Sequence, residues 1–117
     1  DWGPVHFVQY STEHVFEEGS EQWRFIKEDL EAVDRSKTPW VVVSGHRPIY
    51  ISSTGAEGVD SDATVSAALQ QALEPLLLKY KVDLTLHGHH HTYQRTCPVA
   101  SGACLGHADN GEANGPV

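Results

Sequence analysis

The sequence lacks a long hydrophobic run. No apolar stretch approaches the roughly 20 residues that a membrane-spanning helix requires, which excludes a spanning protein. Basic residues are also scarce, since eight Lys and Arg stand against sixteen Asp and Glu. The resulting net charge of −8 has the wrong sign for electrostatic binding of nucleic acid. The first residues have neither the basic start nor the apolar stretch of a signal peptide, which leaves the compartment open if the chain is a processed piece.

Several sequence motifs are missing as well. There is no zinc-ribbon pair, no C-x-x-C redox motif and no G-x-S-x-G nucleophile elbow, so a Ser–His hydrolase is disfavoured. The two cysteines, Cys97 and Cys104, lie close together near the C-terminus. Their spacing is compatible with a small disulfide loop and equally with two free thiols.

What remains is an ordinary globular composition in a short chain. The 117 residues are 39% hydrophobic and 21% charged, which argues against wholesale disorder and fits one domain or part of one. A chain of this length buries roughly two-thirds of its unfolded surface, enough for one hydrophobic core. The unusual feature is a count of eight histidines.

Short runs rich in β-branched and aromatic residues predict strands over residues 5–10, 40–43 and 82–86. The run 40–43 is continuously apolar, which suits a central strand buried on both faces. Between these runs, apolar side chains recur at three- and four-residue intervals and predict helices over residues 21–34 and 65–80.

Local signals refine this pattern. Ser20 offers an N-cap for the first helix, and Pro75 predicts a kink or a restart in the second. Residues 52–63 are expected to form a mobile surface loop, and residues 97–117 a loop-rich tail. The order strand, helix, strand, helix, strand implies right-handed crossovers and a mainly parallel sheet, so the fold class is α/β.

The histidines gather after the ends of two predicted strands. His46 follows the strand over 40–43, and the run His87-Gly88-His89-His90-His91 follows the strand over 82–86. Open α/β sheets bind their ligands at this edge. If the chain stays extended after the glycine, His89 and His91 face one site, where His46 can supply a third imidazole. Three such nitrogens favour zinc, iron or manganese over calcium or magnesium.

For the other histidines and for three nearby polar residues, we expect roles other than metal binding. His87 and His90 are expected to be neighbours rather than ligands, although His90 could hydrogen-bond a substrate. His6 is expected to be packed or at a strand edge, and His14 and His107 to lie on the surface. Asp83 is either a strand-edge polar residue or a carboxylate acceptor for an imidazole N–H. Tyr93 and Arg95 are expected to pack or pair behind the histidine loop.

Two segments carry a specific resemblance. Residues 37–50 (KTPWVVVSGHRPIY) resemble a stretch of the purple acid phosphatases, within the calcineurin-like metallophosphoesterase superfamily. Residues 76–86 followed by 88–95 (GHHHTYQR) are similar to a second stretch of that family, which carries the superfamily signature G-H-x-H. Segments 3–7 and 11–14 are similar to regions preceding the first helix in larger members, so the resemblance covers most of residues 1–105.

The resemblance implies half of a metallophosphoesterase α/β sandwich and a dinuclear metal centre that hydrolyses phosphate monoesters. One metal would be ferric iron and the other zinc, manganese or ferrous iron. Carried over by motif, His46 and His89 would bind the divalent metal and His91 the iron. The family's usual location is secreted, vacuolar or lysosomal, which favours a disulfide between Cys97 and Cys104.

The chain differs from the family pattern in three respects. No G-D-x-x-Y or G-N-H-E motif is present, so the family's two aspartate ligands, tyrosine and asparagine are missing. Residues 51–75 contain no histidine, and Gln94 stands where the family has glutamate. We therefore expect residues 1–117 to be a single partial domain, the C-terminal half of a catalytic domain that lacks its N-terminal half. Alternatively, the chain is a non-catalytic metal-binding module or a half-domain that pairs with another chain.

Overall fold

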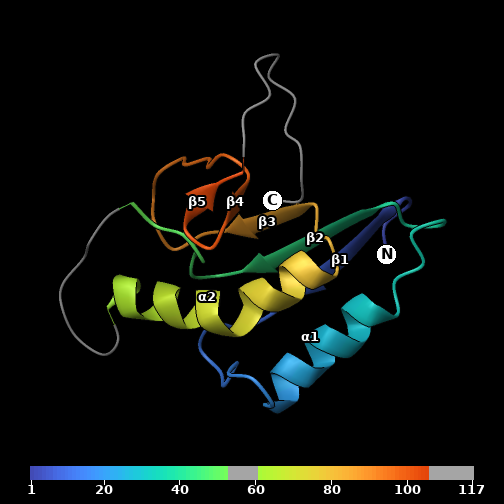
Figure 1. Ribbon diagram of the computed structural model, residues 1–117, viewed down its shortest axis with the longest axis horizontal. Helices are drawn as coiled ribbons and strands as arrows, with labels where there is room; N and C mark the ends of the chain where they lie inside the picture. Colours follow the sequence, from blue (N-terminus) through green and yellow to red (C-terminus); the bar gives the residue numbers. More distant parts are fainter. Residues whose placement is uncertain (53–60, 106–117) are drawn as a thin grey trace.

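The computed structural model describes residues 1–52 and 61–105 and has an α/β fold (Figure 1). A three-stranded sheet and two helices make up most of it, and a small hairpin follows. In chain order the elements are β1 (Val5–Gln9), α1 (Glu21–Glu31), β2 (Trp40–Gly45), α2 (Asp62–Lys79), β3 (Leu84–His87), β4 (Val99–Ala100) and β5 (Ala103–Cys104).

The main sheet is parallel throughout, as the alternation of strands and helices predicts. The strand order is β1-β2-β3, so β2 is central. In this register Val8 pairs with Val43, which pairs in turn with Thr85. Both helices lie on one side of the sheet (Figure 1). The carboxyl ends of β2 and β3 are therefore neighbours at one edge.

Both helices begin at serine N-caps. The Ser20 hydroxyl accepts a hydrogen bond from the Trp23 amide, and the Ser61 hydroxyl accepts one from the Thr64 amide. Helix α1 ends at Glu31, three residues before the predicted end, and α2 begins inside the segment expected to be loop. Neither helix has the length and apolar character that crossing a bilayer would require.

Pro75 lies inside α2 without dividing it, so the expected restart does not occur. Proline removes one backbone donor from the helix interior. Here buried leucines on both sides of it, Leu73 and Leu76, pack into the core and hold the two turns together. Tertiary packing thus overrides the local cost of the proline.

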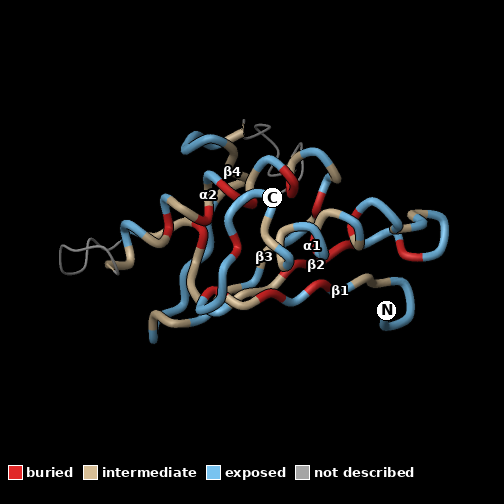
Figure 2. The backbone as a smooth tube through the Cα atoms, turned by 90° about the horizontal axis from the view of Figure 1, so that it is seen from below, coloured by how far each residue is buried: buried red, intermediate tan, exposed pale blue. Residues whose placement is uncertain are grey.

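The hydrophobic core lies between the sheet and the two helices (Figure 2, buried residues in red). Alternate residues of β1 and β2 face the helices, among them Val8, Val41 and Val43. The helices contribute apolar side chains that are buried against these strands. The members from the helices are Ile26 and Leu30 in α1, and Leu69, Ala72, Leu73, Leu76 and Leu77 in α2.

The opposite face of the sheet is apolar and largely uncovered among the described residues. Val42 is buried, but Trp40 of the same strand is exposed on this face, so the expected burial on both faces holds at Val42 and not along the whole strand. Around Val42, the side chains of Phe7, Trp40, Leu84 and Leu86 are 50%, 58%, 41% and 50% exposed. Because Phe7 pairs with Val42 and Val42 with Leu84, these residues share one face. We call them the open sheet face.

The segment after Cys97 forms a hairpin where a loop-rich tail was expected. Strands β4 and β5 pair antiparallel, with Val99 opposite Cys104, and Cys97 and Cys104 form a disulfide. The residues joining the strands, Ser101 and Gly102, both have positive φ, as in the tight turns that favour hairpins. Residues 106–117, including His107, lie outside the described residues.

Candidate metal centre

His46 and His89 meet at the carboxyl edge of the sheet. His46 directly follows β2, and His89 lies two residues after β3. The Gly88 amide donates a hydrogen bond to the His46 carbonyl (2.9 Å), which holds the two segments together. His46 Nε2 and His89 Nδ1 are 3.1 Å apart, and the rings meet edge to face. The predicted convergence of these two imidazoles is found in the structure.

The strand end that carries His46 is packed closely against Tyr10. A Cβ atom placed on Gly45 would lie 2.4 Å from Tyr10 Cζ, a distance that requires a structural shift. Glycine at this position allows the buried tyrosine ring to lie against the end of β2. A larger residue at position 45 would therefore displace either the Tyr10 ring or the end of β2, and with it the His46 backbone.

The chain bends after Gly88 and does not continue as an extended strand. His89 has a left-handed backbone (φ 69°), and the His90 amide donates to the Gly88 carbonyl. The alternating arrangement expected for an extended segment is therefore absent. His90 lies beside His89, with the two rings edge to face, whereas His91 is exposed.

Asp62, the first residue of α2, completes this cluster. Its carboxylate lies 2.9 Å from His89 Nε2 and 3.3 Å from His90 Nε2, and Arg47 Nη1 is 3.4 Å away. The donor atoms of Asp62, His89 and His90 lie within 4.8 Å of one another, a spacing that could hold a metal ion. Among the described residues, His91 is not part of this group.

Asp62 is not among the site residues predicted from the sequence, because residues 52–63 were expected to form a loop. The missed signal is Ser61-Asp62, an N-cap residue followed by an acid in the first turn, which marks a helix start. A helix that starts at Asp62 places this carboxylate at the carboxyl edge of the sheet, where the histidines gather. Residues 53–60 of that loop lie outside the described residues.

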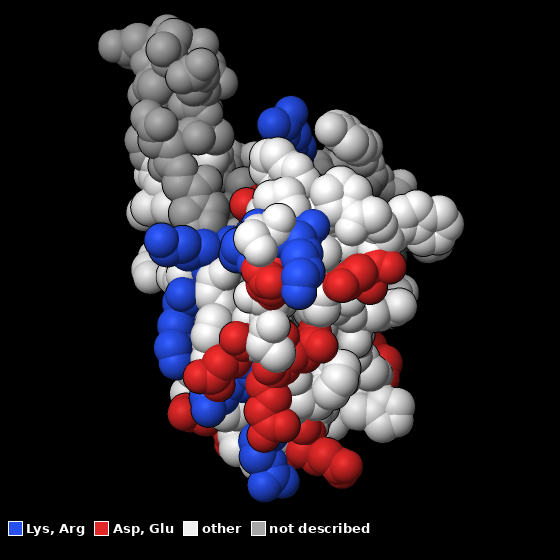
Figure 3. All heavy atoms as spheres, turned by 90° about the vertical axis from the view of Figure 1, so that its right-hand side faces the viewer, with Lys and Arg blue, Asp and Glu red and all other residues white. Residues whose placement is uncertain are grey.

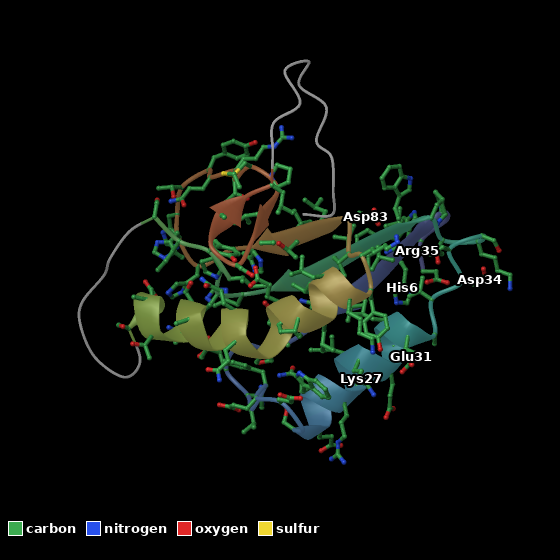
Figure 4. The ribbon with its side chains drawn as sticks, in the orientation of Figure 1. His6, Lys27, Glu31, Asp34, Arg35 and Asp83 are labelled. Carbon is green, nitrogen blue, oxygen red and sulfur yellow. A yellow bond between two sulfur atoms is a disulfide. The ribbon has the colours of Figure 1, made fainter. Side chains whose placement is uncertain are left out.

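Asp83 lies away from the histidines and binds other groups. Its carboxylate accepts hydrogen bonds from Arg35 Nη1 (2.6 Å) and from the Val41 amide (2.7 Å). Figure 4 shows Arg35 and Asp83 together at the amino edge of the sheet. The alternative that Asp83 accepts an imidazole N–H is therefore wrong. Arg35 also donates to the carbonyls of Pro39 and Tyr80 (both 2.9 Å), and to that of Lys81.

A cavity of about 480 Å³ lies at this same amino edge, not at the histidines. Acidic and basic side chains intermix on this end of the molecule (Figure 3), where Lys37 pairs with Asp34. The cavity is lined by Leu30, Glu31, Val33, Arg35, Lys79, Tyr80, Lys81 and Asp83.

Among the other residues considered from the sequence, His6 and His87 are partly buried, whereas Tyr93 and Arg95 are exposed. His6 lies within hydrogen-bond distance of both Asp1 and Asp29, so it is a strand residue tied to α1 as well (Figure 4). Burial lowers the pKa of His87, which favours its neutral form. Tyr93 is 90% exposed and Arg95 is exposed, so the expectation that Tyr93 packs behind the histidine loop is wrong.

Comparison with known proteins gives consistent matches. The family model described as "Calcineurin-like phosphoesterase" matches residues 3–93. The chain is 47% identical to "Probable inactive purple acid phosphatase 9" of Arabidopsis thaliana and 39% identical to "Acid phosphatase" of Aspergillus ficuum. These alignments cover 89% and 90% of this chain, but only 15% and 16% of the relatives.

A solved structure agrees with the sequence matches. The purple acid phosphatase isolated from yellow lupin (Lupinus luteus) seeds superposes on this chain with a TM-score of 0.74 and 38% identity. The match covers 89% of this chain and 18% of the lupin chain. The α/β fold with its parallel sheet is thus that of a purple acid phosphatase, and the chain spans less than a fifth of the length of these relatives.

Proposed function

Because the chain belongs to the calcineurin-like phosphoesterase family, we propose that it supplies part of the metal centre of a protein that hydrolyses phosphate monoesters. The observation that carries the proposal is the contact between His46 and His89 at the carboxyl ends of neighbouring parallel strands. Ligand sites in open α/β sheets lie at this edge. The complete reaction needs chain beyond these 117 residues, as the coverage of the relatives indicates.

The two imidazoles suit one shared divalent metal. Metal–nitrogen bonds to zinc are about 2.0–2.1 Å, so two nitrogens closer than about 4.2 Å can reach the same ion. His46 Nε2 and His89 Nδ1 are 3.1 Å apart, well within that limit. Imidazole nitrogen suits zinc, manganese or ferrous iron, any of which would serve here. We assign these two residues to the divalent metal.

His91 is proposed as the ligand of the second metal, ferric iron. Its support is the G-H-x-H motif, together with its place on the same loop as His89. Its exposed side chain is available to a metal that other parts of the protein help to bind. A bound metal pair would polarise the phosphoryl group and lower the pKa of a bound water molecule.

The residues around these ligands would bind and orient the substrate. His90 is partly buried next to Asp62, and we propose that it contacts the phosphate ester. Arg47 is engaged by two carboxylates, Glu13 and Asp62, which hold its guanidinium at the rim of the site. Because the chain carries a net charge of −8, metal charge would have to dominate locally for a phosphate to bind.

The open sheet face supports the proposal that an N-terminal half of the domain is needed. Exposed apolar patches of this kind mark interaction surfaces. The missing half would cover this face and bring the aspartate, tyrosine and asparagine ligands that the chain lacks. The disulfide between Cys97 and Cys104 is consistent with a secreted, vacuolar or lysosomal protein, because such bonds persist in oxidising compartments.

A second candidate is a non-catalytic metal-binding module or a half-domain that pairs with another chain. It is favoured by relatives whose names include "probable inactive", at 37–47% identity. Metal analysis of the complete parent protein, paired with hydrolysis of a chromogenic phosphate ester, separates the two. Phosphate ester hydrolysis predicts iron plus a divalent metal and turnover that chelation abolishes. Full metal occupancy without turnover would support the non-catalytic module.

A further inference from the structure

We infer that Asp62 is a positioning residue for His89: it holds the imidazole so that Nδ1, and not Nε2, faces the metal. The inference rests on the proposed function, since it concerns one ligand of the proposed divalent metal. The Asp62 carboxylate lies 2.9 Å from His89 Nε2, while His89 Nδ1 lies 3.1 Å from His46 Nε2. The two nitrogens of one ring thus have different partners.

The chemistry of these partners determines the tautomer. An ionised carboxylate only accepts hydrogen bonds, so His89 Nε2 must carry the proton that it donates to Asp62. In a neutral imidazole the other nitrogen then has a free lone pair. That lone pair lies on Nδ1, which faces His46. Histidines that bind metals commonly donate their second N–H to a carboxylate, which fixes both the tautomer and the orientation of the ring.

Asp62 is itself held firmly enough to orient a neighbour. It occupies the first turn of an 18-residue helix, whose N-cap Ser61 accepts a hydrogen bond from the Thr64 amide. A carboxylate at this end of a helix is favoured by the helix dipole. Arg47 and His90 lie on its other sides, at 3.4 Å and 3.3 Å. His89, by contrast, lies in a bent segment that follows a glycine.

The same residues permit a competing arrangement in which a metal binds Asp62, His89 Nε2 and His90 directly. The two arrangements exclude each other, because His89 Nε2 cannot donate a proton to Asp62 and a lone pair to a metal at the same time. We favour the first because Nδ1 faces His46, whose position is fixed by the pairing of β2 and β3. In the second arrangement His46 would have no role as a ligand.

The inference is tested by titrating the metal-free complete parent protein with Co²⁺, followed by absorption spectroscopy and by competition with Zn²⁺. Asp62→Ala is expected to weaken binding by about 10–100-fold, the usual effect of losing an outer partner of a ligand. Asp62→Asn should recover part of this loss, because its amide oxygen still accepts the His89 N–H. The Co²⁺ spectrum of Asp62→Asn should keep its shape, since no ligand has changed.

Asp29→Asn is the matched control. The Asp29 carboxylate also lies against an imidazole, 2.7 Å from His6 Nε2, but no contact joins it to His46, His89 or His90 in the part of the chain that is described. Its Co²⁺ affinity should equal that of the unchanged protein. Circular dichroism of each variant shows that the fold is retained, and Asp62→Asn preserves the size of the side chain if Asp62→Ala unfolds.

Other outcomes overturn the inference in distinguishable ways. If His46→Ala abolishes binding but Asp62→Ala and Asp62→Asn do not weaken it, Asp62 has no positioning role while the proposed centre stands. If Asp62→Asn and His90→Gln abolish binding while His46→Ala does not, the metal occupies the competing arrangement and the ligand assignment is wrong as well. Absence of Co²⁺ binding by the unchanged parent protein would overturn both the inference and the proposed centre.

Discussion

Three consecutive histidines, His89, His90 and His91, have different surroundings although their side chains are chemically identical. His89 lies between His46 and Asp62, His90 contacts Asp62, and His91 is exposed. The difference arises from the left-handed backbone at His89, which turns the chain immediately after β3. Single substitutions along this segment therefore test separate roles.

In the complete parent protein, His89→Ala and His91→Ala are each expected to lower metal content and the rate of phosphate ester hydrolysis by at least about 10–100-fold, because each removes a proposed ligand. His90→Ala should cost much less, because His90 lies beside Asp62 and edge to face with the His89 ring but is not a proposed metal ligand. Metal analysis and steady-state rates of the three variants provide the measurement. Equal rate losses for His90→Ala and His91→Ala, with metal content unchanged in both, would contradict the assignment.

Tyr10 gives a prediction about alkaline stability. Its ring is buried, its hydroxyl has no hydrogen-bond partner among the described residues, and burial raises its pKa above the ordinary value of about 10. Above pH 10 the unfolded chain loses this proton while the folded chain keeps it, so the free energy of unfolding falls as pH rises. Tyr10→Phe should reduce that fall.

At pH 7 the same substitution should leave stability unchanged or raise it, because an unpaired buried hydroxyl costs about 1–3 kcal/mol. Urea unfolding of both proteins at pH 7 and at pH 10.5 measures the two effects. A parallel pH dependence in Tyr10→Phe and the unchanged chain would show that Tyr10 does not contribute to alkaline unfolding.

At the scale of elements, the close approach of β2 to Tyr10 predicts a specific sensitivity. Gly45→Ala places a Cβ atom 2.4 Å from the Tyr10 ring, so either the strand end or the ring must move. Overpacking of this kind typically lowers the free energy of unfolding by about 1–3 kcal/mol. The cost should shrink in a Tyr10→Ala background, and a double-mutant cycle in urea measures the coupling.

Gly88→Ala serves as the control for this experiment. It too removes a glycine at a strand end on the histidine side of the sheet, but its new Cβ would meet its nearest neighbour, the His46 carbonyl, at 3.7 Å, an ordinary contact. Its stability loss should be small. Equal losses for Gly45→Ala and Gly88→Ala would indicate that the steric conflict with Tyr10 is not the cause.

Local sequence patterns predicted the elements and the edge of the sheet at which the histidines gather. Strand runs such as 40–43 carry their signal in a few consecutive residues, and parallel pairing then places His46 next to the loop after β3. The finer geometry depends on contacts between distant residues. Nothing near His89 in the sequence shows that Asp62, 27 positions earlier, lies against its ring.

Two other deviations have the same origin. Pro75 is a local helix breaker, but the leucines that flank it are buried against the sheet and α2 continues through it. Asp83 precedes the histidines in sequence, yet a strand separates it from them and Arg35 binds its carboxylate instead. In both cases a contact with residues that are distant in the sequence determines the observed structure.

For the whole molecule, the open sheet face and the incomplete ligand set predict that the 117-residue chain alone does not hydrolyse phosphate esters. The chain supplies imidazoles, but no bridging carboxylate that would hold two metals together is expected from its motifs. With added iron and zinc, the purified chain should not turn over a chromogenic phosphate ester. Metal-dependent turnover that chelation removes would show that fewer ligands suffice than the family pattern implies.

Arg35 joins two segments at the amino edge of the sheet, the loop before β2 and the connection between α2 and β3, through Asp83 and the carbonyls of Pro39, Tyr80 and Lys81. His46, His89 and His90 lie at the opposite edge, and no side chain among those named takes part in both networks. Substitutions at the carboxyl edge can therefore remove the proposed metal ligands and leave the Arg35 network in place. Loss of these ligands during evolution does not require loss of the fold.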